Sequence, residues 1–301
     1  MLRLSPDVRS ALDAGRPVVA LESSVLAQGL PIPANREAAE RMNRAVREVG
    51  AEPAITAVIS GAPTLGVTPD ELEILLRREG ARKVAGRDLP VCIAQGGHGA
   101  TTVSAALVLA HAAGIDVFAT GGIGGVHRGT PFDESADLSE LARSPLVVVC
   151  AGAKSILDLP ATLERLESYG VTVIGYRTDE LPGFFTAGTG LRLAARAETP
   201  DEIAGAFRAA RALRRPGATL VVQAPPAAHA LGSEEVETAI RGALERAGRE
   251  RVTGAGVTPF LLSEVERGTG GRSLGANLAL LEENARLAAR IAVELQGPMR
   301  H

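Results

Sequence analysis

The chain has 301 residues, of which 46% are hydrophobic and 22% charged, and its formal net charge is -3. A composition of this kind is typical of a soluble globular protein. No excess of basic residues and no aromatic platform indicates nucleic-acid binding, and no apolar run is long enough to span a bilayer. The amino terminus has no signal-peptide core, so we expect a cytoplasmic protein without nucleic-acid or membrane partners.

Short β-branched runs alternate with amphipathic, alanine-rich stretches along the whole chain. We expect strands at residues 17–22, 55–60, 90–95, 115–120, 146–150, 171–176 and 219–223. We expect helices at residues 35–49, 69–78, 101–113, 201–214, 233–247, 258–266 and 274–295. This alternation predicts a single α/β domain over residues 1–301, with three α/β/α layers and a mostly parallel, possibly mixed central sheet.

A carboxylate ends the first expected strand, because Glu22 directly follows the apolar run at 18–21. A partly buried carboxylic acid has a raised pKa and can donate a proton at neutral pH. Glu22 is therefore a candidate general acid, although a helix cap or a buried ion pair would use the same residue type.

Lysine is rare in this chain: only Lys83 and Lys154 occur, against a Lys+Arg total of 32. Arginine stays protonated and forms no imine, whereas a lysine amine can do so once burial lowers its pKa. Lys154 is expected just beyond the carboxyl end of the buried strand at 146–150, where active sites of α/β folds lie. Lys83 stands among other charged residues and is expected to bind an anion. The alternative is that both lysines survive by chance in a chain that has drifted toward arginine.

Glycine-rich segments follow two of the expected strands. Residues 96–103 lead into a helix, whose first amides could hold a phosphate. A tight turn with a threonine cap is the alternative interpretation of the same sequence. Residues 121–129 indicate a loop that lets a ligand approach the backbone. Asp133, Glu134 and Asp137 come next, and their hard oxygen ligands suit Mg²⁺ or Mn²⁺ held with several waters. A plain helix start is the alternative for this acidic stretch.

Longer motifs follow one another along nearly the whole chain. They are VALES at 19–23, GATTV at 99–103, FATGGIGGVHRG at 118–129, CAGAKSILD at 150–158, TPFLL at 258–262 and TGGRSL at 269–274, with Asn277. Together they resemble the pseudouridine-5′-phosphate glycosidase family, also called the indigoidine synthase A-like family. Uninterrupted motifs in a fixed order are far more specific than any of the short patterns above.

The resemblance implies an enzyme that reversibly cleaves pseudouridine 5′-phosphate to uracil and ribose 5-phosphate with a divalent metal, usually Mn²⁺. By matching motif, Lys154 would be the nucleophile, Glu22 the proton donor and Asp133 the metal ligand. Further residues would contact the substrate: Lys83, Val103, His127, Ser135, Ala136, Asp137 and Asn277. The resemblance also implies a homotrimer, with a pseudouridine kinase as its metabolic neighbour.

The carbon–carbon bond between ribose and uracil explains the need for a lysine. Protonating a heteroatom does not release a base through carbon, so the two-carboxylate route of ordinary glycosidases does not apply. With the furanose ring opened, the Lys154 amine can hold C1′ as an imine while Glu22 moves protons. Two alternatives stay open: an aldolase-like lyase that uses the same lysine on another phosphosugar, and a non-catalytic phosphosugar-binding accessory protein.

Some positions depart from the family pattern. Ser24 replaces a commoner threonine, Ala255 stands where a lysine is common, and residues 223–226 lack the asparagine that usually precedes the proline. These changes lie around the expected pocket rather than at the residues assigned to bond cleavage. They leave the base preference less defined than the type of reaction.

Overall fold

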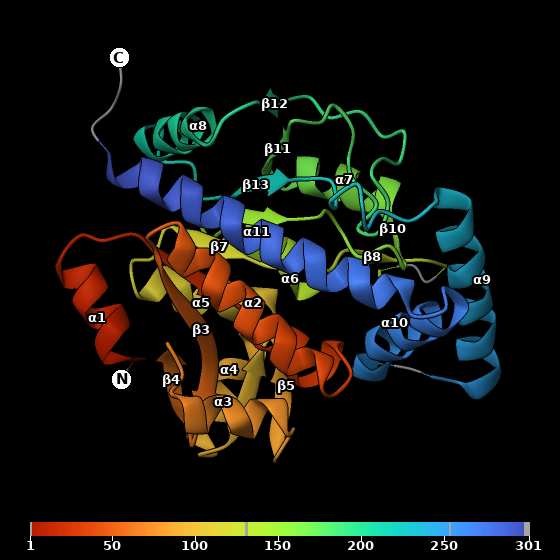
Figure 1. Cartoon of the computed structure of the whole chain (residues 1–301), viewed down its shortest axis with the longest axis horizontal. Helices are drawn as coiled ribbons and strands as arrows, with labels where there is room; N and C mark the ends of the chain where they lie inside the picture. The colour runs from red at the N-terminus through yellow and green to blue at the C-terminus, as the bar shows by residue number, and fades with distance from the viewer. Residues whose placement is uncertain (1, 130–131, 253, 298–301) are drawn as a thin grey trace.

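The computed structural model describes residues 2–129, 132–252 and 254–297, and an 11-stranded sheet forms its centre (Figure 1). Strands pair in the order β1-β4-β3-β2-β7-β9-β13-β11-β12, and β6 joins β5 to β3. Their bounds are β1 (Arg3–Leu4), β2 (Val18–Leu21), β3 (Glu52–Ile59), β4 (Ala62–Leu65), β5 (Ala81–Val84), β6 (His98–Thr101), β7 (Val117–Ala119), β9 (Val147–Cys150), β11 (Thr172–Tyr176), β12 (Arg196–Ala197) and β13 (Thr219–Val222). Because β3 runs antiparallel to β4 and β6 while the other pairs are parallel, the sheet is mixed and mostly parallel, as predicted.

Helices cover both faces of this sheet, which confirms the three predicted layers (Figure 1). The long α11 (Arg272–Gln296) packs between α2 (Ala34–Glu48) and α8 (Pro200–Ala212) on one face. The other face carries α5 (Val103–Ala112), α6 (Ala136–Leu141) and α7 (Leu159–Ser168). The remaining helices are α1 (Pro6–Asp13), α3 (Pro69–Leu76), α4 (Leu89–Ala94), α9 (Ser233–Glu250) and α10 (Val257–Gly268), with short helical turns η1 (Val25–Gly29), η2 (Gly86–Asp88) and η3 (Gly254–Gly256). No described helix combines the length and apolarity needed to cross a bilayer.

One apolar core joins the two ends of the chain, since it contains Val8 as well as Ala292. Strands β2 and β9 are buried at every position. Strands that are covered on both faces have continuous apolar sequences rather than alternating ones, which is why these two runs could be predicted as strands.

The expected strand at 90–95 is wrong, because these residues form helix α4. Pro90 lies in the first turn of α4, where its missing amide costs no hydrogen bond. The following residues, 98–101, form strand β6 rather than a phosphate-binding turn, and α5 begins only at Val103. Gly99 in β6 packs so closely on Val84 and Cys92 that a side chain there would overlap them.

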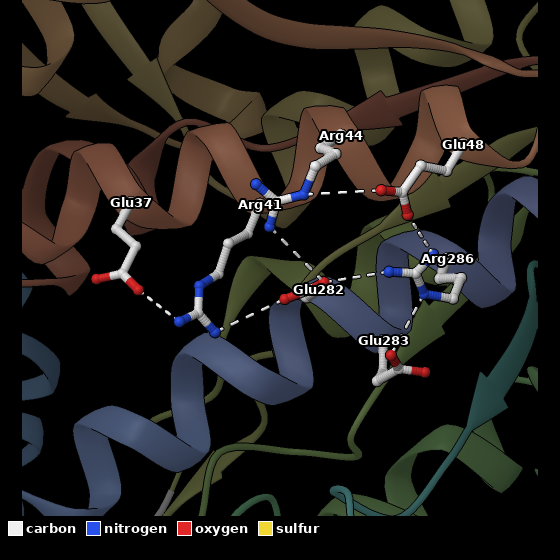
Figure 2. A network of polar contacts seen from close by, with 7 residues as sticks. All are labelled: Glu37, Arg41, Arg44, Glu48, Glu282, Glu283 and Arg286. Carbon is white, nitrogen blue, oxygen red and sulfur yellow. Dashed lines mark hydrogen bonds and ion pairs between the residues drawn. The ribbon is translucent and has the colours of Figure 1, made fainter.

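An ion-pair network on the surface links α2 to α11 (Figure 2). Arg286 of α11 lies 2.7 Å from Glu48 of α2, and Arg41 of α2 lies 3.6 Å from Glu282 of α11. Single exposed pairs contribute little to stability, but a network that spans two helices also fixes their register. The register of α11 matters because this helix delivers Asn277 and Asn284 to the polar end of the sheet.

Candidate active site

The candidate catalytic residues follow neighbouring parallel strands. Strand β7 pairs with β2 on one side and β9 on the other, so the carboxyl ends of the three strands meet at one edge. Glu22 directly follows β2, and Lys154 lies in the loop after β9. This edge of a parallel sheet is where α/β folds bind their ligands. Both residues therefore lie where the sequence predicted them, beyond the carboxyl ends of buried parallel strands.

Glu22 is a buried carboxylate held by hydroxyl groups, with only 4% of its surface exposed. The Thr120 hydroxyl donates to Oε1, and the Ser24 hydroxyl donates to Oε2. Ser24, not Glu22, occupies the N-cap position of η1. Among the described residues, Glu22 thus forms neither a helix cap nor a hydrogen-bonded ion pair, and hydroxyl groups hold both of its oxygens beside the cavity.

Lys154 is half-buried in a loop that is fastened to the glycine-rich segment after β7. Its amide donates to the Ile123 carbonyl at 3.1 Å, and Ala151 donates in the same way to Gly121 at 2.9 Å. Gly152, with φ of +88°, lies so close to the Pro182 carbonyl that a Cβ there would meet it at 2.5 Å. Gly152 therefore lets the loop after β9 pack closely on Pro182, while the two amide bonds to the glycine-rich segment set the position of the lysine.

Lys83 reaches the same site from β5. Part of its side chain stays open to solvent, yet burial of the amine is the largest cause that lowers its pKa, and the charge of Lys154 lowers it further. Glu22 and Asp137 act in the opposite direction. A lowered pKa means that the neutral amine becomes available at a lower pH than for a free lysine. The two lysines of the chain and these two carboxylates form one electrostatic cluster.

Two adjoining cavities meet at this cluster. The outer cavity, about 340 Å³, is lined mainly by polar residues, and the inner cavity, about 40 Å³, is lined by a larger share of apolar ones. Both are lined by Glu22, Ser24, Lys83, Lys154 and Thr258. Predicted substrate and metal residues in the outer cavity are Val103, His127, Asp133, Ser135, Ala136 and Asp137, while Asn277 lies in the inner one.

Asp137 lines the outer cavity, but its carboxylate is already used by the protein. Oδ1 accepts from the Ser104 amide at 2.9 Å and Oδ2 from the Gly124 amide at 2.8 Å. It thus binds the first turn of α5 to the glycine loop, at the positive end of that helix. Ser135, the N-cap of α6, accepts from the Asp137 amide, and a Cβ on Gly124 would overlap Ser135.

The acidic stretch fits a hydrated metal ion rather than a closed cage. The described residues contain no group of three His, Cys, Asp or Glu side chains placed to hold a metal. Glu134 forms an ion pair with Arg165 at 2.8 Å. Asp133 is 52% exposed, and its only ion-pair contact among the described residues is His127 Nδ1 at 3.1 Å. A single carboxylate with several waters is a common way to bind Mg²⁺ or Mn²⁺. Asp133 can supply that carboxylate.

Several residues of the site were not predicted from the sequence. Asn284, 1% exposed on α11, donates to the Thr120 carbonyl at 2.8 Å and accepts from Gln223 Nε2 at 2.8 Å. It therefore holds the residue whose hydroxyl binds Glu22. Gln28, on η1, lines the inner cavity. An asparagine within the apolar stretch 276–292 was the available signal for Asn284, since a buried amide needs partners.

Comparisons with known proteins find relatives that match this chain over nearly its whole length. The family model described as Indigoidine synthase A like protein matches residues 7–294. A protein of Gemmatimonas aurantiaca named pseudouridine-5′-phosphate glycosidase is 60% identical over 293 residues, which cover 97% of this chain and 96% of that protein. A protein of the same name from Symbiobacterium thermophilum is 49% identical over 302 residues, with 98% of each chain covered.

Solved structures are similar over nearly the full length. The prealnumycin C-glycosynthase AlnA, crystallised in complex with ribulose 5-phosphate, has a TM-score of 0.91 and 36% identity, covering 98% of this chain and 97% of that one. An indigoidine synthase A-like protein from Thermotoga maritima has a TM-score of 0.88 and 39% identity, covering 94% of both chains. The chain belongs to the indigoidine synthase A-like family.

Proposed function

We propose that this chain reversibly cleaves the carbon–carbon glycosidic bond of pseudouridine 5′-phosphate to give uracil and ribose 5-phosphate. The names of its relatives at 49% and 60% identity support this activity. The structural observation that carries the proposal is that Glu22, Lys83 and Lys154 line both cavities. A nucleotide with its sugar phosphate in the outer cavity and its base in the inner one has its glycosidic bond at these residues.

The outer cavity suits the sugar phosphate. Its wall contains the start of α5, with the Thr102 and Ser104 hydroxyl groups, and the amine of Lys83. Asp137 already accepts from the Ser104 amide at this helix start, so the amine of Lys83 is the main group that attracts phosphate. A phosphate dianion beside Lys83 favours the protonated amine and offsets the burial that lowers its pKa. Binding energy gained there positions C1′ against Lys154, far from the phosphate itself.

The proposed chemistry proceeds through an imine. Glu22 donates a proton to O4′ as the C1′–O4′ bond breaks, and the Lys154 amine forms a bond to C1′. The C1′–C5 bond then breaks while C1′=N forms, and its electron pair leaves with C5 of uracil, which takes up a proton. Water adds to the imine and releases ribose 5-phosphate and the free amine. The net reaction consumes one water and needs no oxidant.

We also propose that Asp133 holds Mn²⁺, largely through waters. A divalent ion bound there would supply positive charge beside the sugar phosphate. His127, 3.1 Å from Asp133, would orient that carboxylate. The resemblance further supports a homotrimer, a cytoplasmic location and a pseudouridine kinase as the source of substrate, all of which stay predictions.

Uracil release tests the proposed function. The purified chain with Mn²⁺ is incubated with pseudouridine 5′-phosphate, and uracil is measured by chromatography beside the Lys154→Arg variant, which keeps the charge but forms no imine. We expect release by the wild type and none above background by the variant. Turnover of other phosphosugars without uracil release would favour the aldolase-like lyase, and phosphosugar binding without any turnover would favour the accessory protein.

A further inference from the structure

Two residues that line the inner cavity carry unpaired oxygen atoms. Among the described residues, the buried side-chain nitrogen and oxygen atoms without a hydrogen-bond partner are Gln28 Oε1, Ser155 Oγ and Asn277 Oδ1. Gln28 and Asn277 both line the inner cavity, beside Glu22 and Lys154. A buried acceptor without a donor is destabilising, so native proteins rarely keep one without a reason. Two of them in one cavity indicate a ligand that brings donors.

The orientation of Gln28 follows from its one protein hydrogen bond. Its Nε2 donates to the Ala81 carbonyl at 3.2 Å. A carbonyl can only accept, so the amide group cannot be turned over without losing this bond. Oε1 is therefore left as an acceptor in the cavity that Gln28 lines. Because Ala81 begins β5, the same bond ties this wall to the strand that carries Lys83.

The rest of the inner cavity is mainly apolar. Val25, Phe184, Pro259 and Leu262 supply apolar walls. The backbone of residues 121–122 completes the lining, and a Cβ on Gly122 would overlap the Phe184 ring. Pockets for small ligands typically combine such apolar walls with a few polar groups that determine orientation. Here Gln28 Oε1 is one such polar group, and the amide group of Asn277 adds another.

The base of a C-linked nucleotide matches these acceptors. Uracil joined to ribose through C5 keeps both ring N–H groups, and they lie on opposite flanks of the axis from C5 to C2. The two amide side chains come from separate elements, Gln28 from η1 and Asn277 from α11. An N-linked uridine has lost one of these donors to its glycosidic bond. A C-linked uracil therefore offers a ring N–H donor on each flank, one of which can meet Gln28 Oε1.

We propose that Gln28 is a specificity-determining residue, whose Oε1 accepts a hydrogen bond from one ring N–H of uracil. This inference rests on the proposed function and defines the base that the site selects. A site that is built to bind a donor discriminates strongly against analogues that lack it, because its acceptor is then left unpaired.

Binding of free bases to the ribose 5-phosphate complex tests the role of Gln28. The probes are uracil, 1-deazauracil and 3-deazauracil, each deaza compound having one ring N–H replaced by C–H. The variant is Gln28→Met, which keeps the side-chain length, and the matched control is Gln95→Met, because Gln95 is exposed. We expect the wild type and the control to bind uracil at least about 10-fold more tightly than one deaza analogue, and Gln28→Met to reduce that ratio to within about 3-fold.

Measurements of catalysis and of sugar binding distinguish a failure of the Gln28 proposal from a failure of the proposed function. We expect Gln28→Met to lower kcat/KM for pseudouridine 5′-phosphate about 10- to 100-fold, with the borohydride-trapped ribose 5-phosphate adduct retained. A variant that keeps the wild-type ratios for both deaza analogues overturns the role of Gln28 while the glycosidase activity stands. Loss of the sugar adduct in both Gln28→Met and Gln28→Leu assigns Gln28 a structural role and also overturns it. A wild type that releases no uracil overturns the proposed function itself.

Discussion

Replacing Asp137 by asparagine separates a structural role of this carboxylate from a substrate-binding one. Both of its oxygens accept from backbone amides, those of Ser104 and Gly124, and the residue is only 5% exposed. Asparagine keeps one acceptor but places an NH₂ group against the other amide. One charge-assisted hydrogen bond is lost, at about 1.5–3 kcal/mol, and buried donors then face each other.

From these contacts we expect Asp137→Asn to lower the free energy of unfolding by about 2–4 kcal/mol. In a thermal melt this corresponds to a drop in Tm of roughly 3–6 °C for a chain of this size. Asp133→Asn is the matched control, because Asp133 is 52% exposed and His127 is its only ion-pair contact among the described residues. Its unfolding free energy should change by less than about 0.5 kcal/mol.

Chemical denaturation of the wild type and the two variants measures these differences. An Asp137→Asn variant as stable as the wild type, with weaker ribose 5-phosphate binding, would refute the structural role and return Asp137 to the substrate contacts. A variant that is destabilised by the expected amount while Asp133→Asn is not would support it.

Three further predictions follow from the site. Because burial lowers the pKa of Lys83, the folded state binds fewer protons there than the unfolded state, and stability should rise with pH between the folded and unfolded pKa values. Lys83→Met should remove this rise and weaken ribose 5-phosphate binding, as urea titrations over a pH series and calorimetry can show. Asn284→Ala removes the hydrogen bond to the Thr120 carbonyl, so kcat should fall about 10- to 100-fold while KM changes by less than about 3-fold. Steady-state kinetics measure both constants, and a change in KM alone would contradict this prediction. Burial raises the pKa of Cys150 to about 12, so neither this thiol nor that of buried Cys92 should react with Ellman's reagent at pH 8 until the chain is denatured. Rapid reaction of either thiol in the native protein would contradict this prediction.

The layers of the fold could be predicted because their signal is local. A valine run such as β9 is apolar at every position only when both of its faces are covered. The same rule failed at 90–95, where a short apolar run fits a buried helix turn equally well. Strand β5 has no apolar run, since its Lys83 and Arg82 are exposed, and it exists because β6 pairs with it.

The candidate site could be predicted only in part. Glu22 and Lys154 were identifiable because the carboxyl ends of buried strands are where such folds bind ligands. The use of both Asp137 oxygens by backbone amides depends on how α6 packs against α5 and the glycine loop. The unpaired oxygen of Gln28 depends on a hydrogen bond to Ala81, 53 residues away. Contacts of this kind have no local sequence signal.

Reductive trapping tests the central claim most directly. The wild type and Lys154→Ala are incubated with ribose 5-phosphate and borohydride, and the products are examined by intact and peptide mass spectrometry. A stable pentose-phosphate adduct on Lys154 that is absent from Lys154→Ala is the predicted result. An adduct on Lys83 instead, or no adduct from a wild type that still releases uracil from pseudouridine 5′-phosphate, would contradict the imine at Lys154.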